Sequence, residues 1–135
     1  MSGKTLVTAV GLLGALTVAL GAFAAHGLRK LVTPDTLAVF ETGVRYQFYH
    51  VLALLLTCLI RQPQADRFVR MACSFFLAGI LLFSGSLYLL TYVKFRELDA
   101  LYWIGAITPV GGLCFILGWL SLIPALRKMT KAAVD

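Results

Sequence analysis

The chain has 135 residues, of which 60% are hydrophobic and 13% are charged, and its mean hydropathy is +0.89. Soluble domains contain about 45–50% apolar and about 25% charged residues, so this composition excludes an ordinary soluble domain. The formal net charge of +6 comes from 12 Lys and Arg against 6 Asp and Glu, and we expect these cations to face anionic lipid headgroups rather than nucleic acid.

Three charge-free runs are long enough to cross a membrane, which takes about 20 helical residues. They are Thr5–Ala25, Met71–Val93 and Ala100–Leu126. A fourth run, Tyr46–Ile60, is shorter and crosses only if the helix extends through a flanking arginine. We therefore predict an all-α membrane protein with four transmembrane helices that form a single domain over residues 1–135.

The first apolar run imitates a cleaved signal peptide, because "AFA" at Ala22–Ala24 fits an A-x-A site. The run is as long as a full span, so we expect it to be retained. Its small residues recur at spacings of four and seven, which predicts close packing against another helix: Gly11, Gly14, Ala15, Ala19 and Gly21.

The segment after the first span has a helix-start signature. Thr33, Pro34 and Asp35 read as an N-cap, a first helical proline and an acid favoured by the helix dipole. We predict an interfacial amphipathic helix from about Pro34 that runs into the second span and bends near Gly43. Its apolar stripe is Leu37, Phe40 and Val44.

The stretch "FETGVRYQFYH", Phe40–His50, crowds polar groups against an apolar run. Glu41 and Arg45 stand four residues apart, in the order that favours an ion pair on a helix. A lipid-facing helix does not tolerate so much polarity, so the cluster must face protein, a water-filled pocket or the headgroup layer. The candidate cluster, with its expected partners on other spans, is His26, Glu41, Arg45, Tyr46, Gln47, Tyr49, His50, Ser84, Ser86 and Thr108.

Two roles for this cluster stay open. One is a polar lock that fixes the helices together, and the other is an ion or proton path or a lipid-headgroup site that uses Glu41, Arg45 and His50. A metal site on His26, His50 and Glu41 lacks the HxxxH or HExxH spacing. No base stands beside Ser84 in the sequence, and the three cysteines have no CxxC spacing. We therefore predict no metal, no cofactor and no catalytic residue.

Further features lie in the last two spans and in the charge distribution. Gly85 predicts helix packing, and Pro109 followed by Gly111 and Gly112 predicts a kink or break. If both termini lie in the cytoplasm, seven basic residues lie on the cytoplasmic side and five on the opposite side. Because cytoplasmic loops usually carry the excess of Lys and Arg, this count favours cytoplasmic termini. The cytoplasmic set is Lys4, Arg61, Arg67, Arg70, Arg127, Lys128 and Lys131, and the opposite set is Arg29, Lys30, Arg45, Lys94 and Arg96.

Four motifs in order resemble the YgdD/YwdK-like family of small inner-membrane proteins, a family defined by a domain of unknown function. They are "GAFAAHGL" (Gly21–Leu28), "FETGVRYQFYH" (Phe40–His50), "LFSGSLYLL" (Leu82–Leu90) and "GAITPVGG" (Gly105–Gly112). One departure is Ala24, where the family motif leads us to expect glycine. The resemblance implies four spans and a membrane-stabilising or accessory role in the bacterial inner membrane, and it supplies no catalytic residues.

From the packing faces and the lack of a catalytic constellation we expect a non-enzymatic membrane protein. Its expected partners are membrane lipids, further copies of itself or other membrane proteins. The alternative is a small transporter or channel in which Glu41, Arg45 and His50 line a path beside the break at Pro109.

Overall fold

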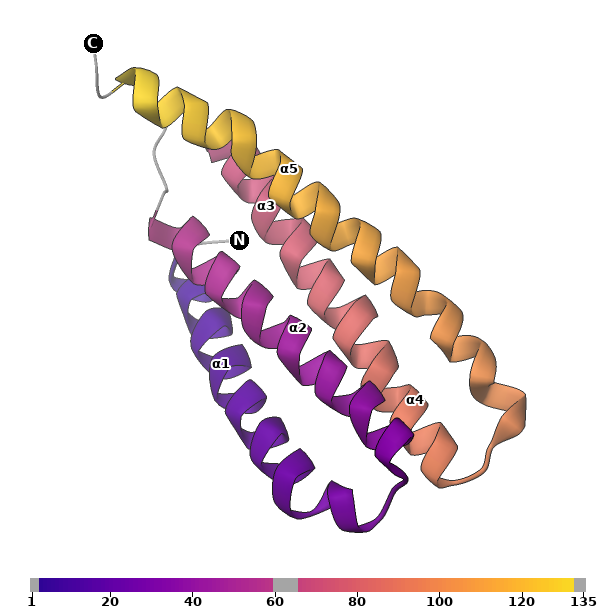
Figure 1. Cartoon of the computed structure of the whole chain (residues 1–135). Helices are drawn as coiled ribbons and strands as arrows, with labels where there is room; N and C mark the ends of the chain where they lie inside the picture. The colour runs from indigo at the N-terminus through magenta and orange to yellow at the C-terminus, as the bar shows by residue number, and fades with distance from the viewer. Residues whose placement is uncertain (1–2, 60–65, 133–135) are drawn as a thin grey trace.

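The computed structural model describes residues 3–59 and 66–132, and the regular structure in these ranges is helical throughout. Four rods lie side by side in the order α1, α2, α3–α4 and α5, as Figure 1 shows. Helix α2 packs between α1 and α4, and α3 packs along α5. The elements are α1 (Gly3–His26), η1 (Leu28–Lys30), α2 (Pro34–Leu59), α3 (Asp66–Gly79), the π-helical segment η3 (Ile80–Ser84), α4 (Gly85–Phe95), the 3-10 helix η4 (Asp99–Ile107) and α5 (Thr108–Ala132).

Three of the four rods are long and apolar enough to cross a membrane. These stretches are Lys4–Lys30, Arg67–Phe95 and Asp99–Lys128. Helix α2 does not qualify, because the polar residues of its first two-thirds offset the apolar stretch Val51–Leu59, which at 1.5 Å per residue is only about 13 Å long. The prediction of four transmembrane helices is therefore wrong.

The predicted interfacial helix is also wrong. Helix α2 begins at Pro34 as expected, and Thr33 Oγ1 accepts the backbone N–H of Thr36 at 3.3 Å, which is the predicted cap. The helix then continues through Gly43 to Leu59 without interruption. Gly43 is buried, and a Cβ there would lie 2.8 Å from the ring of Tyr88. This glycine therefore permits close packing of α4 and is not a bend.

A regular seam along α2 faces the rest of the bundle. Its buried positions follow spacings of four and three, which is the heptad pattern of helices that pack at a shallow angle. The members of this seam are unusually polar or small for a core: Thr36, Phe40, Gly43, Gln47, His50, Leu54 and Thr57.

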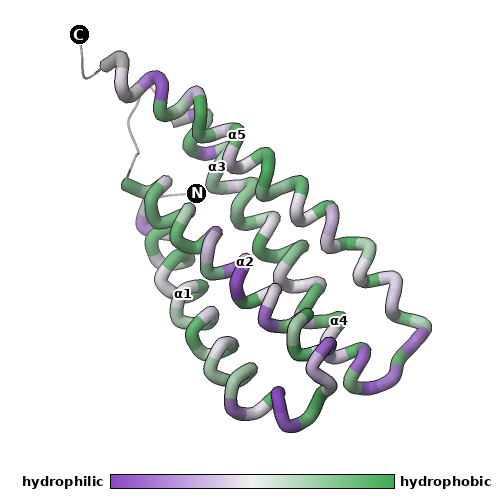
Figure 2. Tube along the Cα trace, viewed as in Figure 1, coloured by the Kyte–Doolittle hydropathy of each residue, from purple (hydrophilic) through white to green (hydrophobic). Residues whose placement is uncertain are grey.

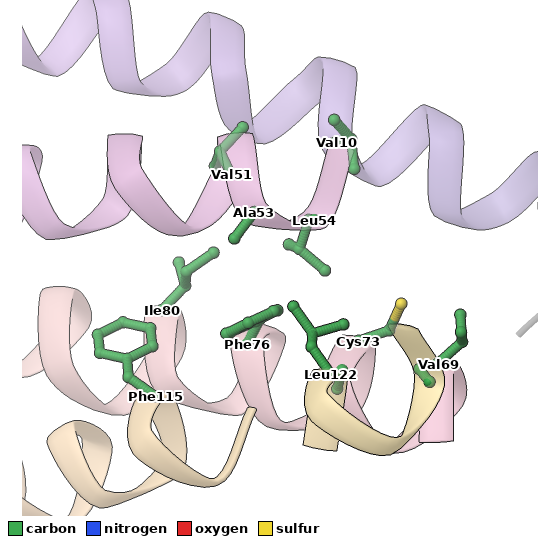
Figure 3. Packing of buried hydrophobic residues seen from close by; sticks show 12 residues of the cluster. Val10, Val51, Ala53, Leu54, Val69, Cys73, Phe76, Ile80, Phe115 and Leu122 are labelled. Carbon is green, nitrogen blue, oxygen red and sulfur yellow. The ribbon is translucent and has the colours of Figure 1, made fainter. Parts of the chain in front are cut away.

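Two hydrophobic clusters hold the rods together. The larger one joins α1 and α2 to α3 and α5, and Figure 3 shows Leu54, Phe76 and Leu122 among the side chains that meet there. The smaller one consists of Ala24, Leu28 and Phe40 near the α1–α2 connection. Many large apolar side chains outside these clusters are exposed along the rods, and Figure 2 shows long hydrophobic stretches on α1 and α5. An apolar exterior of this kind suits contact with lipid.

Glycines set the closest approach between the rods. A Cβ at Gly111 of α5 would stand 2.3 Å from the backbone nitrogen of Phe83, so α5 lies directly on the π-helical segment. Gly79 and Gly118 similarly face the rings of Phe115 and Phe76. These two glycines were not among the predicted packing positions.

The predicted packing glycines occupy varied environments. A Cβ at Gly14 or at Gly21 would make ordinary contact with α2, at 3.7 Å, and one at Gly112 would make ordinary contact with Phe83, at 3.8 Å. A Cβ at Gly11 or at Gly85 would meet nothing within 4 Å. Pro109 lies in the first turn of α5, where η4 gives way to an α-helix, so its missing N–H costs no internal bond. The proline inside α5 is Pro124.

Candidate functional site

Gln47 is the polar centre of the bundle, and its side chain is only 2% exposed. Its Nε2 donates to Thr17 Oγ1 at 2.8 Å and to the carbonyl of Leu13 at 3.3 Å, both on α1. Its Oε1 accepts the hydroxyl of Tyr88, on α4, at 2.9 Å. One amide therefore joins three helices, and both of its ends are satisfied.

The neighbours of Gln47 complete this network. Thr17 donates its own hydroxyl to the carbonyl of Leu13 at 2.7 Å. The ring of Tyr88 packs on Phe40 of α2 with centroids 4.8 Å apart. Because unsatisfied polar groups are costly in an apolar interior, this arrangement lets α2 carry an amide in its buried seam.

His50 lies one turn further along the seam and is 5% exposed. Its Nδ1 lies 2.7 Å from the carbonyl oxygen of Tyr46, which can only accept a hydrogen bond. Its Nε2 lies 3.3 Å from the indole nitrogen of Trp119, which can only donate one. The proton of the imidazole is therefore on Nδ1, and Nε2 is unprotonated and accepts the hydrogen bond from Trp119. His50 is therefore held as a neutral ring in one tautomer.

Aromatic rings enclose the imidazole. His50 stacks face to face on Phe115 with centroids 3.4 Å apart and planes 7° apart. Tyr46 stacks on Phe83 at 4.5 Å, and Phe76 meets Trp119 edge-on at 5.3 Å. A groove of about 630 Å³ opens over these rings between α2 and α5, and its lining is mainly apolar.

Two serines flank the start of α4. Ser86 Oγ and Thr108 Oγ1 lie 2.7 Å apart and hydrogen-bond across α4 and α5, and Ser86 Oγ also donates to the carbonyl of Phe83. Ser84 ends the π-helical segment, and its hydroxyl is fully buried without a hydrogen-bond partner among the described residues. π-helical turns are rare and often lie at functional sites.

Glu41 and Arg45 face away from the buried seam. Both side chains are exposed and line a groove between α1 and α2. The ion pair expected between them is not found among the described residues. The acid and the base are thus separate from the Gln47 network.

The remaining residues of the predicted cluster have exposed side chains. Tyr49 is 52% exposed and Tyr46 is 38% exposed. His26 is exposed at the C-terminal end of α1, and it does not meet His50. Within residues 3–59 and 66–132, no three His, Cys, Asp or Glu side chains stand close enough to share a metal ion.

Sequence reasoning missed Thr17, Tyr88 and Trp119, although each completes a bond to a predicted residue. Thr17 and Tyr88 sit in long apolar runs where they resemble incidental span residues. The heptad spacing along α2 would have pointed to Gln47 and His50 as the inward pair, but only if polar residues were admitted to the pattern.

The chain matches the family described as "Protein of unknown function (DUF423)" over residues 20–112. It is 44% identical over 116 residues to a UPF0382 membrane protein of Haemophilus influenzae, covering 86% of this chain and 88% of the relative. It is 41% identical over 118 residues to the UPF0382 membrane protein YwdK of Bacillus subtilis, covering 84% and 88%. It is 35% identical over 132 residues to the UPF0382 inner membrane protein YgdD of Escherichia coli, covering 97% and 96%. No solved structure matches the chain.

Proposed function

The chain belongs to the DUF423 family of membrane proteins, and from this premise we propose that it is a non-enzymatic structural or accessory protein of the bacterial inner membrane. In this role it supports membrane integrity or the assembly of other membrane proteins. The family resemblance predicted from the four motifs is confirmed. The accessory role goes beyond the family description and is our inference.

One observation carries the proposal: Gln47 and His50, the two polar side chains at the centre of the buried seam of α2, have hydrogen-bond partners within the bundle, whereas the buried Ser84 hydroxyl has none among the described residues. Gln47 uses both ends of its amide on α1 and α4, and His50 uses both ring nitrogens within the bundle. A catalytic base or nucleophile needs a free atom that faces its substrate. Side chains whose donors and acceptors are already matched act instead as cross-links that fix the packing of the helices.

The partners that we propose are membrane lipids, further copies of the chain and other membrane proteins. The exposed apolar surface of α1 and α5 supports lipid or helix contact. The proposed inner-membrane location is supported by the Escherichia coli relative, which is named as an inner membrane protein. We further propose that both termini lie in the cytoplasm. Helix α2 leads the chain back beside α1 although it is not apolar enough to qualify as a span by itself, so the start of α1 and the end of α5 lie at the same end of the rods (Figure 1). More basic residues are assigned to that end than to the other.

The experiment is chemical crosslinking in native membranes, followed by identification of the crosslinked species. The proposal expects defined complexes, either homo-oligomers or pairs with other membrane proteins. A strictly monomeric, uncrosslinked chain would contradict the assembly role. Purified protein in liposomes supplies the second arm, in which the proposal expects neither lipid turnover nor solute flux.

A transporter or channel is the competing outcome of the liposome assay. Flux that Glu41→Gln abolishes would favour it over an accessory role. The matched control is Glu97→Gln, because Glu97 is also exposed but lies between α4 and η4, away from the α1–α2 groove.

A further inference from the structure

An open groove of about 410 Å³ between α1 and α2 holds two opposite charges in apolar surroundings. Its walls include Gly21 and Ala24 of α1, and Glu41 and Arg45 of α2 line it. Both charged side chains are exposed, and no hydrogen bond or ion pair engages either of them within the described ranges. A carboxylate and a guanidinium are thus available to a ligand, one turn apart.

The way α2 packs against α1 shows how deep Glu41 and Arg45 lie in the membrane. Gly21 lies opposite Val44, so Arg45 is about level with Gly21 and Glu41 is one turn nearer to the end of α1. Helix α1 has 24 residues and is about 36 Å long, so a hydrocarbon core of about 30 Å centred on it ends about two residues before His26. Glu41 therefore lies at the hydrocarbon boundary and the Cα of Arg45 about one turn inside it.

The exposed face of α2 changes character just beyond these charges. Phe48 is 45% exposed, Leu52 is 42% exposed and Leu59 is 76% exposed, so the same face becomes apolar within one turn of Arg45. Figure 2 shows this change along α2, from hydrophilic segments in its middle to a hydrophobic end. A phospholipid has the same order along its length, from a charged headgroup to hydrocarbon chains.

We propose that this groove binds a phospholipid whose headgroup carries a primary amine. Glu41 accepts hydrogen bonds from the ammonium, and Arg45 donates to the phosphate. In such a lipid the ammonium is outermost and the phosphate lies beneath it, which is the order of Glu41 and Arg45 across the boundary. Side chains tilt towards the N-terminus of their helix, so the guanidinium of Arg45 points from its deeper Cα towards the phosphate level.

The acyl chains of the lipid then continue along Phe48 and Leu52. Charge-assisted bonds to carboxylate and phosphate are the strong class, and Arg matches the geometry of phosphate oxygens. A lipid in this place also satisfies two charges that would otherwise be exposed at the edge of the hydrocarbon. The proposal rests on the proposed function in one respect: it names one of the lipid partners.

A second copy of the chain fits this groove less well. Copies inserted in the same orientation are related by an axis along the membrane normal, which keeps each residue level with its equivalent. Glu41 would then be level with the carboxylate of the other copy, and Arg45 with its guanidinium. Like charges placed in this way repel, whereas a zwitterionic headgroup offers the opposite charge to each residue.

The test uses the full chain reconstituted in nanodiscs with equal parts of phosphatidylethanolamine, phosphatidylcholine and phosphatidylglycerol. Lipids retained after mild detergent extraction are counted by native mass spectrometry. We expect the wild type to retain phosphatidylethanolamine about tenfold over the other two, which is a typical effect of one charge-assisted contact. Glu41→Gln should bring the ratio of phosphatidylethanolamine to phosphatidylcholine close to one, because these two zwitterionic headgroups differ only in the amine that Glu41 binds. Arg45→Gln should lower the retention of all three lipids, because each has a phosphate.

Arg96→Gln and Glu97→Gln are the matched controls, because both residues are exposed but lie outside the groove. The ratio of retained lipids is measured within one sample of folded protein. A variant that yields less folded protein therefore does not change this ratio unless its lipid preference has changed. Equal retention by the wild type, or an unchanged ratio in Glu41→Gln, overturns the proposal. So does a lipid-free dimer that either groove variant dissociates. Turnover of the bound lipid would contradict the accessory function while leaving the site in place.

Discussion

Replacing Gln47 by leucine should destabilise the bundle by about 2–4 kcal/mol. The change removes the bonds to Thr17 Oγ1 at 2.8 Å and from Tyr88 at 2.9 Å. It also removes the longer bond to the Leu13 carbonyl at 3.3 Å, but that carbonyl still accepts the hydroxyl of Thr17. Side-chain hydrogen bonds between membrane helices contribute about 0.6–1.7 kcal/mol each. Thr17 keeps its bond to Leu13, but the hydroxyl of Tyr88 loses its partner, which adds about 1 kcal/mol or more. Leucine has a volume similar to that of glutamine, so cavity formation adds little.

The assay is reversible unfolding of the detergent-solubilised chain, followed by tryptophan fluorescence. A double-mutant cycle that combines Gln47→Leu with Tyr88→Phe should give a coupling energy of about 0.6–1.7 kcal/mol. Thr8→Val is the control, because Thr8 is exposed and bonds only within its own helix. If Gln47→Leu unfolds within about 0.5 kcal/mol of the wild type, which is the range of ordinary surface changes, and shows no coupling, the Gln47 network does not hold the helices together.

Three further predictions concern packing, protonation and an unmatched hydroxyl. Gly111→Ala should cost about 1–3 kcal/mol in unfolding free energy, because its Cβ would collide with the backbone of Phe83, whereas Gly11→Ala should be neutral or stabilising in the same assay. The unfolding free energy should fall as the pH drops below about 6.5, the ordinary pKa of histidine, because the folded state holds His50 neutral whereas the unfolded state takes up a proton. His50→Phe should remove this dependence of the unfolding free energy on pH. Ser84→Ala should leave stability unchanged or raise it, and a loss above about 1 kcal/mol would mean that the hydroxyl has a partner.

The sequence was sufficient to predict the long apolar rods. Thr5–Ala25 falls within α1, and the later two runs fall within the α3–α4 and η4–α5 rods, because uninterrupted apolar length is a strong local signal. The start of α2 was also predictable, because a threonine cap followed by proline acts within a few residues. The error in α2 came from dividing it near Gly43 into two parts, an interfacial helix and a transmembrane span. A continuous helix with one buried seam takes the place of both parts.

Neither polarity nor ion-pair spacing identified the polar residues that face inward. Glu41 and Arg45 have ideal spacing for an ion pair, yet both are exposed on the groove side of α2. Gln47 is uncharged and was expected to be one member of a broad polar surface, yet it is the buried bridge between three helices. Which face turns inward depends on where Thr17 and Tyr88 stand, and these lie 30 and 41 residues away in the chain.

The underlying reason is that a membrane weakens the ordinary link between hydrophobicity and burial. In water an apolar stripe marks the inside of a helix, but lipid solvates leucine as well as the protein interior does. Along α2, Leu52 and Leu59 are therefore exposed, whereas Gln47 and His50 are buried. In such a chain, hydrogen bonds between helices and the close approach of helix backbones determine which face turns inward. Neither can be predicted without knowing which residues of the neighbouring helix lie opposite. The 3.5-residue spacing of the seam survives this change of solvent, because it reflects the geometry of helix packing and does not depend on polarity.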